Sequence, residues 1–377
     1  MILLSGPNIS GNEWKYVKDC LDTGWVSSVG SYVNQFEEMV ASFAGAKYGV
    51  ATSSGTTALH IALILAGVER EDYVIAPNVT FVASLNSIAY TGAEPILIDV
   101  DPGTWQMDLN LLEQFLTSDT EIRDGACRLR ADGRRIRAIM PVHVLGNMCD
   151  MDRFMDIAAR FQLEVIEDAT EALGSYFSGK HAGSFGKMGC FSFNGNKIIT
   201  CGGGGVIVTD DEDLAKMAKH LTTQAKADAF EYYHDHIGYN YRLVNVSAAM
   251  GVAQMEQLPG FIQRKKEIAA YYMQELGDLP GISFQEVDSR VDPNCWLFTF
   301  RADRQKEILS ALNAQKMQSR PFWVPMNQLP MFKQVKYVQT ADHSDAIYQN
   351  CLSIPCSTDI TNEQLESIVA TIKSVYS

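Results

Sequence analysis

The stretch FSFNGNKIITCGGGG, residues 191–205, holds one lysine between two apolar runs and ahead of four consecutive glycines. Lys197 has Asn, Gly and Ile as neighbours, a poor setting for a lysine that only faces solvent. Asp168 ends the apolar run LEVIED, and Lys197 follows the next apolar run, GCFSF. Asp168 could simply cap a helix. Together, however, a carboxylate and an amine that follow successive buried strands are candidate catalytic residues.

A Ser/Gly/Thr cluster opens an apolar helix in ATSSGTTALHIAL, residues 51–63. An N-cap without a ligand would explain this cluster. It also suits a phosphate seat, because unpaired N–H groups and the helix dipole converge there. Thr56 adds a hydroxyl, and Ser192 could donate another. Phe81, just after the apolar run YVIAP, is either a core aromatic or a platform that stacks on a ring.

These residues supply a phosphate cradle, an aromatic plate, a carboxylate and a lysine, which is the set that pyridoxal phosphate requires. A carboxylate beside the pyridine nitrogen keeps that nitrogen protonated, and a lysine holds the aldehyde as a Schiff base. No P-loop, dinucleotide fingerprint, HExxH or Ser-His-Asp signature competes with this set. We interpret His234 and His236 as polar loop residues and predict no metal site. The sequence therefore predicts a pyridoxal-phosphate enzyme.

Short Val/Ile-rich runs separated by helical patterns must position these residues. Such runs indicate an α/β fold with a mostly parallel sheet covered on both faces. A long helical stretch and shorter strand candidates follow residue 245. We predict a large cofactor domain over residues 1–245 and a smaller α+β domain over 246–377. The expected strands of the large domain are 73–77, 94–101, 136–144, 163–168, 189–193 and 204–210.

The charge composition limits which classes of molecule the protein can bind. The 377 residues include 31 Lys plus Arg and 45 Asp plus Glu, for a formal net charge of −14. This acidic balance argues against a nucleic-acid backbone or an anionic membrane surface as a partner. Eight scattered cysteines, without a CxxC pair, predict reduced thiols, and no leader or membrane-length apolar run is evident. We expect a cytoplasmic protein. The six arginines of residues 121–138 predict a solvated hairpin or turn.

At these residues the chain resembles the nucleotide-sugar aminotransferases of the fold type I pyridoxal-phosphate superfamily, over essentially its full length. The resemblance implies that Lys197 is the Schiff-base lysine, that Asp168 faces the pyridine nitrogen and that Phe81 stacks on the ring. It also implies cofactor contacts from Gly55, Thr56, Thr57, Ser192 and, near the phenolic oxygen, Glu171. The matching segments are SSGTTALHIAL, PNVTFVASLNSI with GAEPILIDVD, VIEDATEALGS, FSFNGNK and GYNYRLVNVSAAMG.

A homodimer with shared active sites is a further implication of the resemblance, with Asn240 reaching the phosphate of the neighbouring subunit. Relatives that remove a sugar hydroxyl carry His at the lysine position, so Lys197 favours amino transfer. The expected reaction has two stages, with L-glutamate as amino donor and Lys197 as the proton carrier. Asn327 stands where many relatives have His, which leaves its role open.

Within the family, the segments EDATEALGS and FSFNGNKIIT are most similar to enzymes that aminate C4 of a UDP-linked 4-keto-6-deoxy sugar derived from N-acetylglucosamine. A GDP- or TDP-keto-sugar aminotransferase acting at C4 or C3 is the alternative, and a non-catalytic sugar-nucleotide binder is a third. Trp25, Arg242 and Arg320 are candidate substrate contacts. The sequence leaves open the nucleotide base, the configuration of the new amine and the pathway served.

Overall fold

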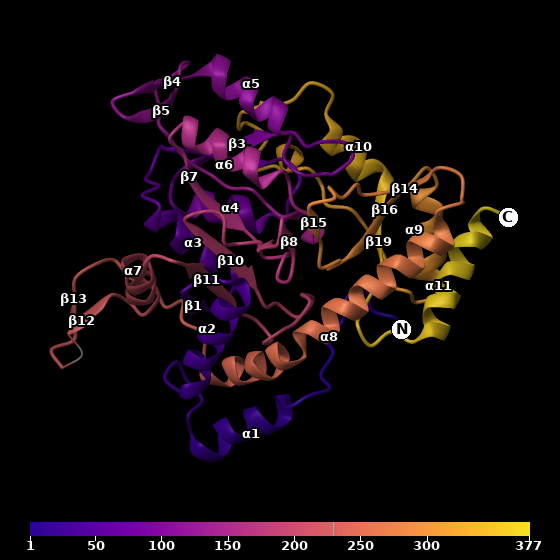
Figure 1. Ribbon diagram of the computed structural model, residues 1–377, viewed down its shortest axis with the longest axis horizontal. Coiled ribbons are helices and arrows are strands. Elements are labelled where there is room, and N and C mark those ends of the chain that lie inside the picture. Colours follow the sequence, from indigo (N-terminus) through magenta and orange to yellow (C-terminus); the bar gives the residue numbers. More distant parts are fainter. Residues whose placement is uncertain (229) are drawn as a thin grey trace.

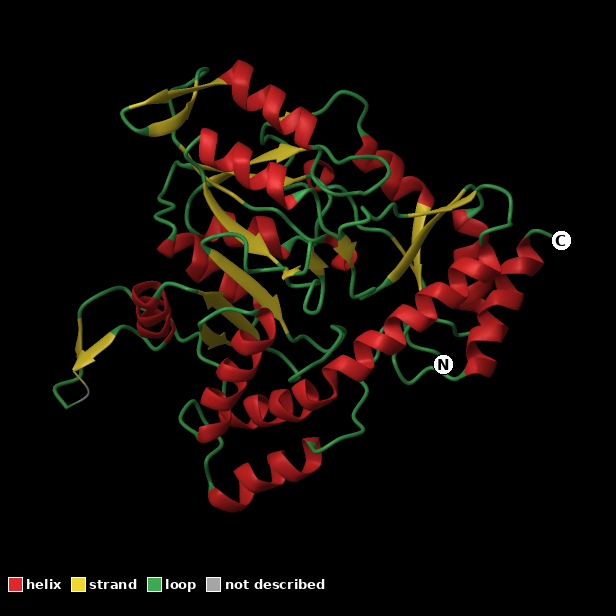
Figure 2. Ribbon diagram, in the orientation of Figure 1, coloured by secondary structure: helices red, strands yellow, loops and turns green. Residues whose placement is uncertain are grey.

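Two parts of different architecture make up the chain (Figure 1). The computed structural model describes residues 1–228 and 230–377. A mixed eight-stranded sheet with helices on both faces forms the larger part, and a four-stranded antiparallel sheet with its own helices forms the smaller part (Figure 2). Among the described residues, no helix combines the length and the apolar composition that crossing a bilayer requires.

The large sheet has the expected mostly parallel arrangement. Every neighbouring pair from β10 to β18 is parallel, whereas β11 runs antiparallel to both of its neighbours. From edge to edge the strands are β1 (Tyr48–Thr52), β11 (Gly205–Thr209), β10 (Met188–Ser192), β7 (Glu164–Asp168), β6 (Ile136–Ile139), β2 (Tyr73–Pro77), β3 (Glu94–Ile98) and β18 (Tyr337–Val338).

Side chains alternate across this sheet, so each strand contributes to two apolar clusters. Val165 and Ile75 belong to one cluster together with residues of α2, α5, α6 and α8, while Ile166 and Val74 belong to the other with residues of α3, α4 and α7. Strands buried on both faces need apolar residues at successive positions, which explains the continuous runs in the sequence. The helices of this part are α1 (Glu13–Thr23), α2 (Ser31–Ala44), α3 (Gly55–Leu65), α4 (Ala83–Tyr90), α5 (Leu109–Asp119), α6 (Met151–Arg160) and α7 (Glu212–Thr222).

Strand boundaries differ from the expected runs at several ends. The run 94–101 forms a strand only to Ile98. The run 136–144 forms a strand only to Ile139, because Pro141 lacks the N–H needed to continue the ladder. Its carbonyl still accepts a hydrogen bond from the N–H of Asp168, at 2.9 Å. β1 has no counterpart among the expected strands. Its sequence, YGVAT, is short and contains glycine, and its place in the sheet comes from antiparallel pairing with β11.

The arginine-rich segment forms the expected hairpin, from β4 (Thr120–Arg123) and β5 (Ala126–Leu129), just before β6. Only part of this arginine-rich segment is solvated in the way that the sequence predicted. Arg135 donates to both carboxylate oxygens of the buried Asp72, at 2.8 and 2.7 Å. The guanidinium of Arg134 lies 3.8 Å from the ring centroid of Tyr73. These arginines therefore attach the hairpin to the start of β2.

The helix α8 (Asn245–Leu276) connects the two parts. Its first half packs on α1 and α2, where Glu13 accepts hydrogen bonds from Gln254 and Gln257. Its second half contacts the small sheet region through Tyr272, whose hydroxyl donates to the Pro355 carbonyl at 2.7 Å. The small part contains β14 (Ile282–Phe284), β16 (Phe298–Ala302), β19 (Cys351–Ile354) and β17 (Arg320–Pro321), with α9 (Gln305–Ala314), α10 (His343–Asn350) and α11 (Asn362–Val375).

The domain division after residue 245 remains a prediction. The smaller sheet is built wholly from strands beyond that point, in keeping with the proposed division. Contacts nevertheless cross this division. α8 packs on the N-terminal helices, and β18 pairs with β3 at the edge of the large sheet.

Replacing Lys265 by Met is expected to destabilise the fold. The ammonium of Lys265 is buried and donates to the carbonyls of Trp296 and Cys356, at 2.8 and 2.7 Å. Its loss leaves two buried acceptors unpaired, which costs about 1–3 kcal/mol. Urea denaturation would measure the difference. Lys266→Met is the matched control, because Lys266 forms a surface ion pair with Asp292 worth less than about 1 kcal/mol. Equal losses in both variants would contradict this account.

Candidate active site

Lys197 lies on a loop that leaves the carboxyl end of β10 and returns at β11. Backbone hydrogen bonds close the loop on itself: Phe193 donates to the Gly204 carbonyl and Cys201 donates to the Phe193 carbonyl, at 2.9 and 3.1 Å. The glycine run allows this close packing, since a Cβ on Gly204 would lie 2.4 Å from Sγ of Cys201. The loop therefore presents Lys197 from a fixed position above the sheet.

Asp168 ends β7, the neighbour of β10, and its carboxylate is buried. One oxygen accepts a hydrogen bond from the hydroxyl of Ser84, at 2.6 Å, and the other accepts from the N–H of Thr170, at 3.2 Å. Ser84 itself shares a 2.7 Å hydrogen bond with Thr80. Because its oxygens are fixed by neighbours on two elements, the carboxylate has a defined orientation.

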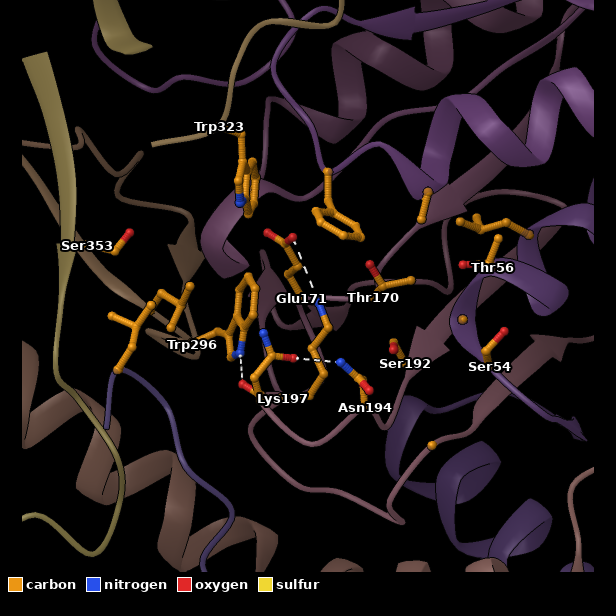
Figure 3. A pocket seen from close by; sticks show the side chains of 18 of the residues that line it. Ser54, Thr56, Thr170, Glu171, Ser192, Asn194, Lys197, Trp296, Trp323 and Ser353 are labelled. Atoms are coloured by element: carbon orange, nitrogen blue, oxygen red, sulfur yellow. Dashed lines mark hydrogen bonds and ion pairs between the residues drawn. The ribbon is translucent and has the colours of Figure 1, made fainter. Parts of the chain in front are cut away.

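A cavity of about 500 Å³ opens between these elements and the small sheet. Figure 3 shows that Lys197, Glu171 and Trp296 meet in it, while Ser54, Thr56 and Ser192 lie together at the opposite side. The residues that line it come from both parts of the chain and include Ser54, Gly55, Thr56, Phe81, Thr170, Glu171, Ser192, Asn194, Lys197, Trp296, Arg320, Trp323 and Ser353.

The amine of Lys197 has an acidic partner and an aromatic partner. Its Nζ atom lies 3.9 Å from Oε1 of Glu171 and 3.9 Å from the ring centroid of Trp296. The other oxygen of Glu171 accepts a hydrogen bond from the N–H of Leu145, at 2.8 Å. Trp296 is fixed in turn by a 2.7 Å hydrogen bond from its indole N–H to the Asn196 carbonyl. The lysine is thus held between a carboxylate and a ring face.

Burial shifts the pKa values of Glu171 and Lys197. It raises the pKa of Glu171 to about 7, against the opposing attraction of Lys197. It lowers the pKa of the Lys197 ammonium, although the carboxylates of Glu171 and Asp168 oppose that shift. Desolvation disfavours each charged form, so both groups titrate closer to neutrality than exposed ones do. Burial therefore makes the neutral amine of Lys197 easier to form than the neutral amine of an exposed lysine.

The amino end of α3 forms the opposite wall of the cavity. Ser54 is the N-cap, and its hydroxyl accepts a hydrogen bond from the N–H of Thr57. Gly55, Thr56 and Ser192 line the cavity here, as the phosphate-seat hypothesis requires. Thr57 does not, because its hydroxyl donates to the Ser54 carbonyl at 2.8 Å and accepts from the Ser54 N–H at 3.0 Å. Thr57 caps the helix, and its predicted phosphate contact stays a prediction.

The remaining predicted residues lie at different distances from the cavity. Phe81 and Arg320 line it, and the Phe81 ring meets Trp323 edge to face, with centroids 6.3 Å apart. Asp168 is buried and is not among the residues that line the cavity. Trp25 and Asn240 are exposed, and neither they nor Arg242 line the cavity of their own chain. Their roles stay predictions.

Two tryptophans of the site were not anticipated from sequence. Trp296 follows Asn294 in a segment read only as a strand, and Trp323 lies in SRPFWVPMN, residues 319–327. Tryptophan close to a strand end is a weak local signal, because most such residues belong to the core. The structure also defines the position of Asn327, which exchanges two 2.9 Å hydrogen bonds with Asn78 at the end of β2. Asn327 therefore ties the segment that carries Trp323 to the large sheet.

These features fit pyridoxal phosphate. The amino end of α3 with Ser192 offers an anion seat, and Lys197 offers an amine at the far side of the cavity. Phe81 also lines the cavity, and Asp168 is buried at the end of β7. A Cβ added to Gly55 would meet Cβ of Ser192 at 2.8 Å. The backbone N–H groups at the start of α3 and the Ser192 hydroxyl are therefore packed so closely that only a glycine fits at position 55.

Replacing Gly55 by Ala is expected to weaken binding of pyridoxal phosphate by the apo-protein. The new methyl group must displace Ser192 or Thr170, and such overpacking costs about 1–3 kcal/mol, or roughly 5-fold to 150-fold in the dissociation constant. A fluorescence titration with the cofactor would measure it. Gly260→Ala, in α8 with open space around the new Cβ, is the matched control. Unchanged affinity in the Gly55 variant would contradict the placement of the phosphate seat.

Comparison with known proteins gives the same assignment. The DegT/DnrJ/EryC1/StrS aminotransferase family matches residues 7–373. GDP-perosamine synthase of Escherichia coli O157:H7 is 38% identical over 374 residues, which cover 98% of this chain and 97% of the relative. GDP-perosamine synthase of Caulobacter vibrioides is 36% identical and covers 99% and 98%. Spr1654 of Streptococcus pneumoniae, solved in its PLP form, superimposes with a TM-score of 0.88 at 25% identity, covering 99% and 98%.

The match spans both parts of the chain and every element that surrounds the cavity. It agrees with the predicted fold, with amino transfer on nucleotide sugars and with pyridoxal phosphate as the cofactor. Both of these relatives bear the name GDP-perosamine synthase, which favours the GDP alternative over a UDP-linked substrate. On sequence and fold together, the chain belongs to the DegT/DnrJ/EryC1/StrS aminotransferase family.

Proposed function

We propose that this protein transfers an amino group from L-glutamate to C4 of a GDP-linked 4-keto-6-deoxy sugar. The observation that carries the reaction type is the Lys197 amine, held beside Glu171 in a cavity whose other end is the amino terminus of α3. GDP is chosen because relatives at 38% and 36% identity bear the name GDP-perosamine synthase. The 4-keto position follows from the resemblance of the site segments.

The chain's own residues divide the work between binding and proton transfer. Bound pyridoxal phosphate supplies an aldehyde that condenses with amines and a ring that withdraws electrons. Gly55, Thr56 and Ser192 hold its phosphate at the positive end of α3. Asp168, fixed by Ser84, keeps the ring nitrogen protonated. Lys197 moves a proton at the carbon that bears the transferred nitrogen, in one direction with the donor and in the other with the sugar.

We assign nucleotide recognition to the side of the cavity that the small part forms. Arg320 lies there in β17, in a protein that is acidic overall, so it is the local cation available to a diphosphate. Trp323 stacks on Phe322, with centroids 4.7 Å apart, and offers an aromatic surface at the same rim. Because Asn327 fixes this segment, the position of both side chains follows from the closure of the small part on the large sheet.

A second copy of the chain is expected to complete each site. Asn240 is exposed and lies outside its own cavity, although the resemblance implies that it contacts the cofactor phosphate. A homodimer would resolve this difference, because Asn240 of one protomer could reach the α3 terminus of the other. Exposed aromatic residues on the nearby hairpin, Tyr232 and Tyr233, are consistent with such a contact surface.

The purified protein with pyridoxal phosphate is expected to show a visible absorption band that L-glutamate removes. Lys197→Ala should lack this response, because the amine that moves the proton is gone. The wild type should then convert a GDP-4-keto-6-deoxy sugar to an amino sugar faster than the UDP-linked analogue, by mass spectrometry of the products.

Each possible result of this experiment tests a different part of the proposal. A response to glutamate in Lys197→Ala equal to that of the wild type would reject the assigned role of Lys197. Preference for the UDP-linked ketone would reject the GDP assignment while leaving amino transfer intact. Lys187→Ala is a control for loss of a lysine, because Lys187 pairs with Glu164 at the other end of β7.

Mixing two inactive variants tests the shared site. In a dimer of Lys197→Ala with Asn240→Ala, one site carries both substitutions and the other carries neither. Activity should therefore return when the two purified variants are dissociated and reassociated together. Each variant treated alone is the control and should stay inactive or weak. If mass spectrometry verifies that heterodimers have formed but the mixture gains no activity, a contribution of Asn240 across the interface is contradicted.

A further inference from the structure

Glu171 is a buried carboxyl group with one cationic neighbour. Only 4% of the residue is exposed, and within the described residues its one ion-pair partner is Lys197, at 3.9 Å. Its second oxygen accepts the N–H of Leu145, which fixes the side chain without neutralising its charge. A carboxylate in this environment needs either the lysine's charge or a proton to be stable.

The groups that face Lys197 make Glu171 its nearest proton partner. Asp168, on β7, contributes a second negative charge, but its oxygens are occupied by Ser84 and Thr170. On the side of the small part the amine meets the neutral ring of Trp296. Arg320 lines the same cavity, and its guanidinium donates to the Ser319 carbonyl instead.

We propose that Glu171 is a proton acceptor for Lys197 and that the two side chains share one proton. An N–H bond of the Lys197 ammonium breaks, an O–H bond forms on Glu171, and a neutral amine and a neutral acid replace the ion pair without a change in total charge. The 3.9 Å separation is longer than a hydrogen bond, and rotation about the four-carbon lysine stem closes it.

Proton transfer to Glu171 leaves Lys197 in the neutral form that the reaction requires. A lysine that abstracts a proton must first be neutral, and no water needs to enter the cavity if a neighbouring carboxylate takes its proton. Trp296 acts as a positioning residue, because its ring keeps the amine on the side that faces Glu171. This inference rests on the proposed function, since amino transfer is what requires a neutral Lys197.

Competitive acetylation of the apo-protein tests the shared proton without cofactor or substrate. The labelling rate of Lys197 at a series of pH values, read by mass spectrometry of its peptide, gives the midpoint at which the amine becomes reactive. In Glu171→Gln that midpoint should fall by about one pH unit or more, because a charge that stabilises the ammonium is removed. The amide can still accept the Leu145 N–H, so a structural role alone would leave the midpoint unchanged.

Glu164→Gln is the matched control, because it makes the same change at the other end of β7, where Glu164 pairs with Arg137 and Lys187. Its Lys197 midpoint should equal that of the wild type. An unchanged midpoint in Glu171→Gln would overturn the proposal. Should that variant fail to fold by circular dichroism, Glu171→Asp replaces it, since withdrawing the carboxylate weakens the same coupling, and an unchanged midpoint would again reject the proposal.

The outcome is independent of the test of the proposed function. A lowered midpoint together with failed amino transfer would leave the shared proton standing and remove the reaction assigned to it. An unchanged midpoint with successful amino transfer would remove Glu171 as the acceptor and leave the transferase intact.

Discussion

Parallel pairing of β7 with β10 is the constraint on which the active site depends. It sets Asp168 opposite Cys190, so the Asp168 carboxylate and the loop that carries Lys197 leave the sheet at the same edge. The pairing requires Gly189, since a Cβ there would lie 2.1 Å from the Gly183 carbonyl. Glu167, buried beside Asp168, accepts the N–H groups of Gly183, Phe185 and Gly186 and so fixes the turn that precedes β10. Residues outside the cavity therefore determine how Asp168 and the Lys197 loop are placed relative to each other.

Burial and charge act against each other at Lys197. Removal from water favours the neutral amine, while Glu171 and Asp168 favour the ammonium, and the ring of Trp296 also attracts the cation. Neither effect alone would suit a group that must both take and release a proton. The pKa of Lys197 is lowered because burial outweighs these attractions, in a protein whose net charge of −14 otherwise favours protonated lysines. The cavity, rather than the overall charge, decides the state of this residue.

The small part contributes the side of the cavity that faces the substrate. Trp296 precedes β16, Arg320 lies in β17 and Trp323 follows it, while Lys265 and the Asn78–Asn327 pair attach these segments to α8 and β2. The cavity therefore joins residues of the large sheet, such as Lys197, to residues of the small part, and Trp296 of the small part lies directly over the Lys197 amine.

The sequence by itself determined the local features. Continuous apolar runs predicted the central strands, and their order predicted a sheet edge where Asp168 and Lys197 meet. The cluster at α3 predicted an anion seat, although not that Ser54 and Thr57 cap each other. The tertiary structure alone decided the place of β1 and β18 in the sheet, the position of Trp296 over Lys197 and the link between Asn327 and Asn78. Hydrophobic periodicity and capping residues act over a few positions of the chain, whereas these contacts join segments far apart in sequence. Such contacts exist only because two packed parts close around one cavity.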